Sequence, residues 1–444
     1  MSIDSFLDAA ERTIDALHGL VLVRGGAVVA EGYWHPYRAD VPHRLFSLSK
    51  SFTSTAVGFA VAEGLVDLDA PVAEYFGGRG DPRMLVRHLL TMTTGHTEDT
   101  APAIVTGEDW ADAFLRLPVG REPGSYFVYN TGATYLAGAI VQRRTGQRLV
   151  DYLRPRLFDP LAFESVTWER CPLGLDTAGW GMTARTAEIA RFGQLYLRDD
   201  RGILPAGWAG EATRRQVENP HWGDLSTVDW RQGYGFQFWR CRHDAFRGDG
   251  AFGQLCVVMP AQDSVLAVNS GTENMQAILD LVWEHLLDDR TPPAPATAAR
   301  LATLALPALH GGQSTADGTF TVANPRRVRP EDWRPSHEQP PTIRSITFSP
   351  GLVTLEDATG THAYPCRPGE WHTNGTQAST GAWTTPTECT LRVAYIDGPF
   401  VRTYRCAFAG DTVTITASDN VSFGPTGYAP IHAVRTPLTD GNGA

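Results

Sequence analysis

The sequence predicts an α+β domain, with an antiparallel sheet flanked by helices and an all-helical region, followed by a smaller all-β, barrel-like domain. Three observations predict this class. Strand-like apolar runs lie near both ends of the first 290 residues, helical periodicity fills the middle, and period-two alternation dominates after about residue 318. We therefore divide the chain into a first domain over 1–290, a linker over 291–318 and a C-terminal domain over 319–444.

The first domain begins with an amphipathic stretch and a hairpin. The pattern over 1–12 predicts an amphipathic helix. It does not indicate a secretion signal, because it lacks a basic segment followed by an apolar core. Two apolar runs around Gly25 and Gly26 predict a β-hairpin over 19–32. The apolar stretch over 47–64 then predicts a long helix.

The middle of the first domain is predicted to be helical and its end to be mainly strands. Helices are expected over 86–92, 134–144 and 184–197. Strands are expected over 234–239, 254–259 and 264–268, before a last helix over 275–287. Because strands stand at both ends with helices between them, we expect one antiparallel sheet completed by both ends of the domain.

The rest of the chain changes character twice. The predicted linker is rich in Pro, Gly and Ala and contains a short helical stretch. Beyond it, apolar and polar residues alternate between Gly, Asp and Pro turns over 343–348, 391–396, 401–408 and 411–416. This alternation predicts an all-β barrel or sandwich.

Composition limits the partners of the chain. With 42% hydrophobic and 20% charged residues, the chain has the composition of a globular protein. Its net charge of −11 argues against nucleic acid or an anionic membrane as a partner. Uninterrupted apolar runs stay well below the length of about 18 residues that a membrane helix needs. We expect a cytoplasmic protein with six reduced cysteines, and the sequence leaves its oligomeric state open.

The basic residues contain one clear outlier. Of the 38 Lys and Arg residues, 37 are Arg, and the single lysine is Lys50, three residues after Ser47. On a helix these two side chains share a face, with Cβ atoms about 5–6 Å apart. A neutral lysine can take the proton of a serine hydroxyl, whereas a guanidinium stays charged. Ser47 and Lys50 are therefore a candidate nucleophile and base. A solvated lysine on a Ser-rich helix start and Schiff-base chemistry are the alternatives.

The motifs around this pair resemble the serine hydrolases related to penicillin-binding proteins and class C β-lactamases, the Ser-x-x-Lys family. The similarity covers about residues 10–290. It includes Phe46-Ser-Leu-Ser-Lys-Ser-Phe-Thr-Ser, His88-Leu-Leu-Thr-Met-Thr-Thr-Gly and Pro123-Gly-Ser-Tyr-Phe-Val-Tyr-Asn-Thr-Gly. The resemblance implies a small-molecule or peptide acyl substrate, with neither a cofactor nor a metal ion.

The resemblance also implies a role for Tyr129. This residue aligns with the family tyrosine, which, as a phenolate or through a proton shared with Lys50, would activate Ser47 and later protonate the leaving group. The hydrogen-bonding residue that follows the tyrosine would be Asn130 or Thr131. Without the resemblance, Tyr129 would be interpreted as a packed aromatic residue.

The third family motif falls on Gly248-Asp249-Gly250. Gly250 fits the motif, and the N–H groups of Ser47 and Ala251 would bind the oxyanion. The position that is cationic in relatives is Gly248, and a side chain at Arg247 would face the other side of a strand. This departure argues against β-lactam hydrolysis.

Aromatic and histidine side chains complete the candidates. Four tryptophans fall in stretches that border the site in relatives, where they would line an acyl pocket or simply pack: Trp180, Trp222, Trp230 and Trp239. We expect His88 and His96 to form hydrogen bonds near helix ends rather than to act as ligands.

The sequence therefore predicts a serine acyl-enzyme hydrolase acting on an ester, thioester or amide bond. The alternative is an ATP-independent acyltransferase or thioesterase that passes the acyl group to an amine or hydroxyl in natural-product biosynthesis. A non-catalytic ligand-binding module is the third hypothesis, and the intact set of Ser47, Lys50 and Tyr129 argues against it. The C-terminal domain resembles lipocalin-like barrels, and its role is left open.

Overall fold

The computed structural model describes residues 2–287, 294–312, 317–325 and 341–437. The chain forms two compact units. The N-terminal unit comprises Met1–Tyr33 and Pro42–Ala302, and the C-terminal unit comprises Trp34–Val41 and Thr303–Ala444. Residues 291–293 and 313–316 of the predicted linker lie outside the described residues. The helix expected within that linker is present as α11, Pro295–Leu301.

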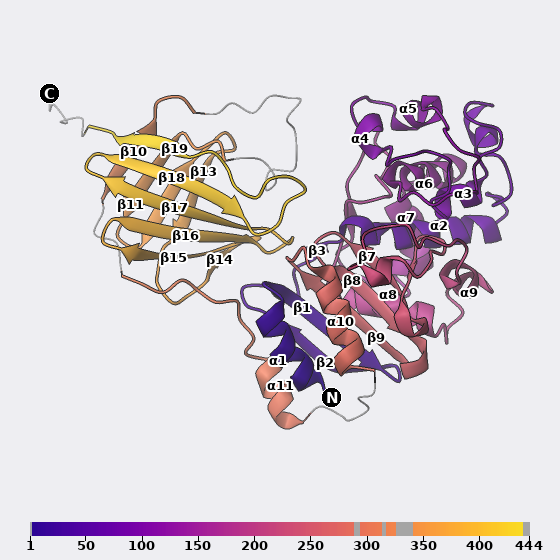
Figure 1. Ribbon diagram of the computed structural model, residues 1–444, viewed down its shortest axis with the longest axis horizontal. Coiled ribbons are helices and arrows are strands. Elements are labelled where there is room, and N and C mark those ends of the chain that lie inside the picture. Colours follow the sequence, from indigo (N-terminus) through magenta and orange to yellow (C-terminus); the bar gives the residue numbers. More distant parts are fainter. Residues whose placement is uncertain (1, 288–293, 313–316, 326–340, 438–444) are drawn as a thin grey trace. The chain divides into compact units, whose positions relative to one another are not determined.

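A six-stranded antiparallel sheet forms the centre of the N-terminal unit (Figure 1). Its strand order is β2-β1-β9-β8-β7-β6. The strands are β1 Leu17–Arg24, β2 Ala27–Tyr33, β6 Trp239–Arg240, β7 Phe246–Gly250, β8 Gln254–Met259 and β9 Ser264–Ser270. Because β1 pairs with β9, the prediction of one sheet completed by both ends of the domain is confirmed.

Helices cover this sheet. The helix α8, Thr186–Leu197, packs on β1, β8 and β9, while α1, Ile3–Thr13, packs with α10, Met275–His285. Every residue of β8 and β9 is buried, as expected for strands that are covered on both faces. The predicted helices over 1–12, 184–197 and 275–287 are thus confirmed.

A helical region carries the rest of the N-terminal unit. Its helices are α2 Ser49–Ala62, α3 Val86–Leu90, α4 Ala101–Ile104, α5 Trp110–Arg116, α6 Thr131–Thr145, α7 Leu149–Leu153 and α9 Trp208–Thr213. The helix α2 packs against α6 and α7 and is buried over most of its length. Its hydroxyls therefore bond internally, except that of Ser54, which has no hydrogen-bond partner among the described residues. Ser51 Oγ donates to the Gln237 carbonyl at 2.8 Å and Thr53 Oγ1 to the Ala178 carbonyl at 2.9 Å.

One predicted element is wrong. Of the strand expected over 234–239, only the last residue belongs to a strand, which is β6. Gln237 has a positive φ of 66°, and a Cβ at Gly235 would lie 2.2 Å from the Ala212 carbonyl oxygen. The Gln237 side chain instead accepts a hydrogen bond from Thr134 and donates to the carbonyls of Leu89 and Leu90. Tertiary hydrogen bonds thus override the local alternation.

The C-terminal unit is one ten-stranded antiparallel sheet that curls into a nearly closed barrel (Figure 1). Its order is β13-β12-β11-β10-β19-β18-β17-β16-β15-β14. The strands are β10 Gly318–Val322, β11 Ser345–Ser349, β12 Leu352–Glu356, β13 Thr361–Pro365, β14 His372–Asn374, β15 Gln377–Thr385, β16 Glu388–Tyr395, β17 Val401–Ala409, β18 Thr412–Asp419 and β19 Ile431–Arg435. The barrel-like prediction is confirmed, and the sandwich alternative is not.

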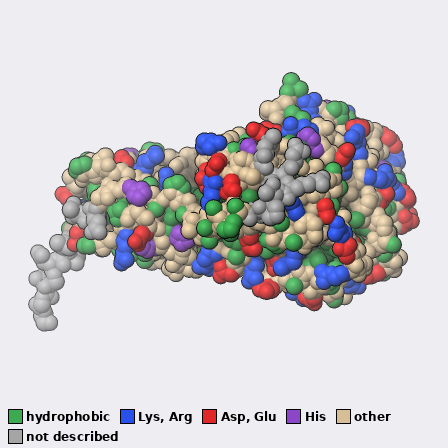
Figure 2. Space-filling view, turned by 90° about the horizontal axis from the view of Figure 1, so that it is seen from below, with side chains coloured by type: hydrophobic (Ala, Val, Ile, Leu, Met, Phe, Trp, Pro, Cys, Tyr) green, Lys and Arg blue, Asp and Glu red, His purple; other side chains and the backbone are tan. Residues whose placement is uncertain are grey.

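The surface carries mixed charge. On the face drawn in Figure 2, Arg side chains lie among Asp and Glu side chains rather than in one basic patch. Within the described part of the chain, helices are too short or too polar to cross a membrane.

Candidate active site

Ser47 stands on a turn between a short strand and α2. The strand β3, His43–Arg44, pairs with β5, Met182–Ala184, in a small sheet that also contains β4, Thr167–Trp168. A 3₁₀ turn, η1, Phe46–Leu48, then leads into α2. Phe46 adopts a positive φ of 48°, a conformation that costs about 1–3 kcal/mol for a residue other than glycine. This turn leaves Ser47 half-buried at the start of a buried helix.

Lys50 lies one turn further along, beside Ser47. Its Nζ donates to Ser47 Oγ at 3.0 Å and to the Gly179 carbonyl at 2.8 Å. The side chain is only 1% exposed, and both of these hydrogen bonds go to uncharged oxygens. Burial lowers the pKa of Lys50 to about 8, against the opposing effect of two carboxylates, Asp99 and Asp249. About half of the lysine is therefore neutral near pH 8.

Tyr129 covers the lysine. Its ring centroid lies 5.0 Å from Lys50 Nζ, and its ring stacks on Trp239 at 5.3 Å. Burial, and then the charge of Asp249, raise the pKa of the Tyr129 phenol above its ordinary value, while a hydrogen bond with Ser47 opposes this effect. The phenol is therefore protonated at neutral pH. This favours a shared proton over the phenolate form that the sequence left open.

The two residues after Tyr129 point to different surroundings. Asn130 is fully buried and caps α6, since its Oδ1 accepts from the Ala133 and Thr100 N–H groups at 3.2 Å each. Its Nδ2 donates to Thr94 Oγ1 at 3.3 Å. Thr131 instead lies on the side of Lys50. A Cβ built at Gly179 would be 2.9 Å from Thr131 Cγ2 and 3.7 Å from Lys50 Nζ, so both side chains border the same residue. Of the pair, Thr131 is the one near the reacting groups.

Asp99 is a residue near the site that sequence reasoning missed. Its Oδ1 accepts from the Thr131 N–H at 2.7 Å and from the Ala101 N–H at 3.0 Å. A carboxylate is favoured at a helix N-terminus by the exposed N–H groups and the helix dipole. Asp99 thus fixes the segment that follows Tyr129 and raises the pKa of Lys50. Its place two residues before a short helix was a weak signal in the sequence.

The strand β7 forms the other side of the site. A Cβ at Gly250 would lie 1.9 Å from the Leu45 carbonyl oxygen, and one at Gly248 would lie 2.5 Å from Leu48 Cδ1. Both glycines therefore let β7 approach the segment that carries Ser47. Beyond the strand, the rings of Phe46 and Phe252 meet edge to face at 5.6 Å. This places the half-buried Ala251 beside the Ser47 turn.

Arg247 and Asp249 occupy the opposite face of β7 from the two glycines, as strand alternation requires. Arg247 is fully buried, and its Nε and Nη2 contact Asp249 Oδ2 at 3.0 and 2.9 Å. Burial raises the pKa of Asp249 above its ordinary value, against the opposing effects of Arg247 and of a hydrogen bond from Trp239. The side chain of Arg247 thus faces away from Gly248, as predicted.

Comparison with known proteins identifies the family. A profile of the beta-lactamase family matches residues 7–287, which is more than half of the chain. The chain belongs to the beta-lactamase family.

Relatives within and around this family carry different names. The 6-aminohexanoate-dimer hydrolase of Paenarthrobacter ureafaciens is 30% identical over 211 residues, which cover 42% of this chain and 53% of that protein. Monacolin J acid methylbutanoyltransferase of Aspergillus terreus is 29% identical over 164 residues, which cover 30% of this chain and 40% of that protein. The chain thus spans about half, or less, of the curated relatives that it matches.

A solved structure extends the likeness over both units. The octameric penicillin-binding protein homologue from Pyrococcus abyssi matches 98% of this chain and 100% of that chain, with a TM-score of 0.53 and 15% identity. At this identity the match shows the fold alone. The beta-lactamase-like fold followed by a C-terminal barrel-like sheet is therefore shared with a known structure.

The four tryptophans that the sequence placed near the site lie in two groups, one around Tyr129 and one beside Trp110. Trp222 lies 6.0 Å from the Tyr129 ring, and Trp239 stacks directly on it. Trp230 covers the guanidinium of Arg247 at 4.1 Å. Trp180 instead stacks on Trp110 at 5.6 Å. Three of the four predicted tryptophans thus gather around Tyr129 and its neighbours.

The predicted histidines form hydrogen bonds at short range. His88 Nδ1 accepts from the Leu85 N–H at 3.1 Å, next to the start of α3. His96 Nδ1 lies 2.9 Å from Thr94 Oγ1. The contact of His88 agrees with the role predicted for it, whereas His96 bonds within the segment between α3 and α4, away from a helix end.

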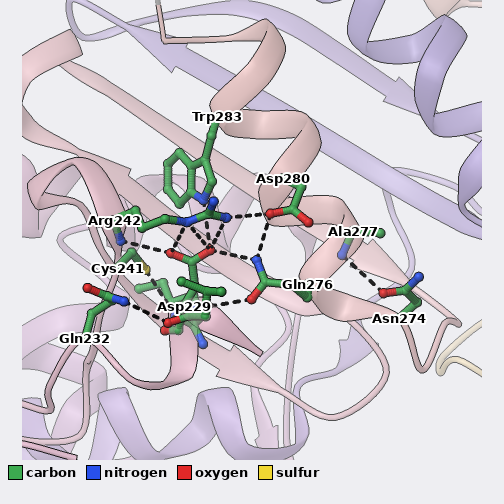
Figure 3. Close-up of polar contacts among 11 residues, drawn as sticks. Asp229, Gln232, Cys241, Arg242, Asn274, Gln276, Ala277, Asp280 and Trp283 are labelled. Atoms are coloured by element: carbon green, nitrogen blue, oxygen red, sulfur yellow. Dashed lines mark hydrogen bonds and ion pairs between the residues drawn. The ribbon is translucent and has the colours of Figure 1, made fainter. Parts of the chain in front are cut away.

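Asp229 is buried in a polar cluster with Arg242, Gln276 and Trp283 (Figure 3). Its carboxylate accepts from Arg242 Nη2 at 2.7 Å, Gln276 Nε2 at 2.7 Å and Trp283 Nε1 at 2.9 Å. These hydrogen bonds outweigh burial and lower the pKa of Asp229 to about 2. The Asp229 carbonyl in turn accepts from Arg247 Nη1 at 2.8 Å. Arg247 is therefore hydrogen-bonded to the backbone of a residue whose side chain is itself fixed by three donors.

Proposed function

We propose that the chain is a serine acyl-enzyme hydrolase that cleaves an ester, thioester or amide bond of a small molecule or peptide. The observation that carries the proposal is the pairing of Lys50 Nζ with Ser47 Oγ at 3.0 Å. The lysine is buried and its pKa is lowered to about 8, so a neutral amine is available at the serine near physiological pH.

In the proposed acylation step, neutral Lys50 accepts the proton of Ser47 Oγ while Oγ bonds to the substrate carbonyl carbon. The N–H groups of Ser47 and Ala251 would bind the oxyanion, a contact whose removal costs about 2.7–4 kcal/mol elsewhere. Tyr129, protonated because its pKa is raised, gives its proton to the leaving group and regains one from Lys50. The leaving group departs as the carbonyl re-forms on Ser47.

Deacylation would use the same groups in reverse. Neutral Lys50 accepts a proton from water by way of Tyr129 as the water oxygen bonds to the acyl carbon, and this proton then passes to Ser47 Oγ as the acyl–Oγ bond breaks and the acid leaves. An amine or hydroxyl acceptor in place of water would make the chain an acyltransferase. The half-buried setting of Ser47 and the tryptophans around Tyr129 support this second candidate, because an aromatic wall excludes water.

A panel of p-nitrophenyl esters tests the proposal. We expect the wild type to release p-nitrophenol with a burst, and Ser47→Ala to lose this activity. Ser54→Ala is the matched control, since Ser54 lies buried on the same helix and its hydroxyl has no hydrogen-bond partner among the described residues. Equal activity of the wild type and Ser47→Ala would contradict the proposal.

The same esters, offered with amine acceptors, separate the two candidates. A hydrolase gives the free acid in an amount that is independent of amine concentration. A transferase gives amide in proportion to the amine.

The cytoplasmic compartment remains a further proposal from the sequence, and fractionation of cells that express the native chain tests it.

A further inference from the structure

The strand β7 carries an acidic side chain, Asp249, next to Gly248, the position that is cationic in relatives. A Cβ at Gly248 would meet Leu48 Cδ1 at 2.5 Å and Ser51 Oγ at 2.6 Å. A long side chain at this position would therefore displace α2. The charged side chains of the strand lie on its other face, and they are those of Arg247 and Asp249.

Arg247 is poorly placed to contact a substrate, because its side chain is fully buried and its Nε and Nη1 donate hydrogen bonds to the protein. Nε and Nη2 contact Asp249, and Nη1 donates to the Asp229 carbonyl at 2.8 Å and to Cys241 Sγ at 3.0 Å. The guanidinium carbon lies 4.1 Å from the Trp230 ring centroid, and the side chain is fully buried. Its charge is thus paired with Asp249 inside the protein.

Asp249 is placed differently. It is 7% exposed and stands two residues before Ala251, next to the Ser47 turn. Its charge acts on both Lys50 and Tyr129, and it accepts a hydrogen bond from Trp239, whose ring stacks on Tyr129. The charge of Asp249 therefore acts on the proposed reacting groups, and Trp239 links its carboxylate to the Tyr129 ring.

The pairing of Asp249 leaves it able to accept more hydrogen bonds. Both contacts from Arg247 go to one oxygen, Oδ2, whereas a carboxylate has two oxygens and about four acceptor sites. The buried pair of the C-terminal unit differs, because Arg402 contacts both oxygens of Asp419 at 2.8 Å each, and Tyr428 adds a third donor. Asp249 also has a third donor, Trp239, but its arginine contacts one oxygen rather than both, so the two pairs differ in geometry.

Resting on the proposed hydrolase function, we propose that Asp249 is a specificity residue that binds an ammonium group on the acyl substrate. An ionised carboxylate accepts hydrogen bonds and cannot donate them, so it attracts an ammonium and repels a substrate carboxylate. Asp99 adds a second negative charge that acts on Lys50 and Tyr129. The site thus selects amine-bearing acyl groups by charge.

The test compares p-nitrophenyl esters of ω-aminoalkanoic, alkanoic and dicarboxylic acids of matched chain lengths at a pH near 8. For the wild type we expect kcat/KM for the ammonium ester to exceed that for the carboxylate ester by about 10- to 100-fold, at one chain length at least. The ratio is taken within one enzyme sample, so loss of folded protein cancels.

Asp249→Asn keeps the shape of the side chain and removes its charge. We expect this variant to bring the ratio within about threefold of unity. Asp249→Glu retains the charge and should keep a preference for the ammonium ester. Glu284→Gln is the matched control, because it removes a charge from an exposed side chain of α10 and should leave the ratio as in the wild type.

Competition on the wild type gives a reading that needs no variant. Alkylammonium ions should inhibit cleavage of the neutral ester more strongly than alkylcarboxylates of equal length. A wild-type ratio at or below one for every chain length overturns this inference alone, and so does a ratio that Asp249→Asn leaves unchanged. If no ester is cleaved and Ser47 takes no fluorophosphonate, the proposed hydrolase function fails, and this inference falls with it.

Discussion

The two sides of the site differ in how they treat charge. On the helix side, Lys50 is buried beside uncharged oxygens, so its pKa falls to about 8. On the strand side, Arg247 and Asp249 are buried as a pair, and each charge supports the other. The same burial thus lowers the pKa of the lysine, as a proton acceptor needs, and leaves the arginine a permanent cation.

This difference explains which side can vary. The helix side has one geometry that works, because a hydroxyl and an amine must stay within hydrogen-bond distance. The strand side needs only the close approach of its backbone, which Gly248 and Gly250 permit. Asp249 could therefore take a place next to the site without disturbing the pair of Ser47 and Lys50.

The largest expected effect breaks the helix side. Lys50→Arg keeps a cation and removes the possibility of a neutral base, so acylation should fall by about 10²–10⁴-fold at every accessible pH. Burst kinetics with a p-nitrophenyl ester measure this rate. Retained acylation would remove Lys50 from the proton transfer, whereas thermal unfolding reports separately whether the variant is folded.

A somewhat smaller effect is expected at Tyr129. Tyr129→Phe keeps the stacking on Trp239 and removes the hydroxyl, so we expect a loss of about 10²-fold in acylation. The loss should be greater for esters with a poorly acidic leaving alcohol than for p-nitrophenyl esters, since only the former need a proton. Equal losses for both kinds of ester would argue against Tyr129 as the proton donor.

The strand side is tested through its backbone. Gly250→Ala places a Cβ 1.9 Å from the Leu45 carbonyl oxygen, so we expect a loss of about 1–3 kcal/mol in the free energy of unfolding together with slower acylation. Gly210→Ala is the matched control, because nothing lies within 4 Å of its Cβ in α9. Urea unfolding measures both, and equal stability of the two variants would contradict the close approach of β7.

The smallest expected effect joins the two sides. The acid limb of kcat/KM should rise through a pH of about 8 as Lys50 loses its proton. Asp249 raises the pKa of Lys50, so Asp249→Asn should move this limb to lower pH. Asp99→Asn should move it in the same direction while keeping the Oδ1 cap of α6. A shift to higher pH in either variant would contradict the charge arrangement.

Local signals in the sequence predicted much of this molecule. The spacing of Ser47 and Lys50 and the hairpin over 19–32 depend on neighbouring residues, and each agrees with the geometry observed. The pairing of β1 with β9 followed from the order of elements. Patterns of this kind are visible because they act within one element.

Long-range contacts set what the sequence could not predict. The strand expected over 234–239 failed because Gln237 bonds to distant residues. Asn130 is a favoured N-cap residue, a local signal that could have distinguished it from Thr131. Strand alternation predicted that Arg247 and Asp249 share one face of the strand. It could not predict the hydrogen bond from Arg247 to the carbonyl of Asp229, which lies 18 residues away in the chain.

The measurement that tests the central claim most directly is covalent trapping of the nucleophile. The protein is treated with a fluorophosphonate, and intact mass and peptide mapping locate the adduct. The proposed mechanism predicts one adduct, on Ser47, forming faster as the pH rises through about 8 and absent from Ser47→Ala. A wild type that gains no adduct, or a Ser47→Ala variant that gains the same adduct, would contradict the assignment of Ser47 as the nucleophile.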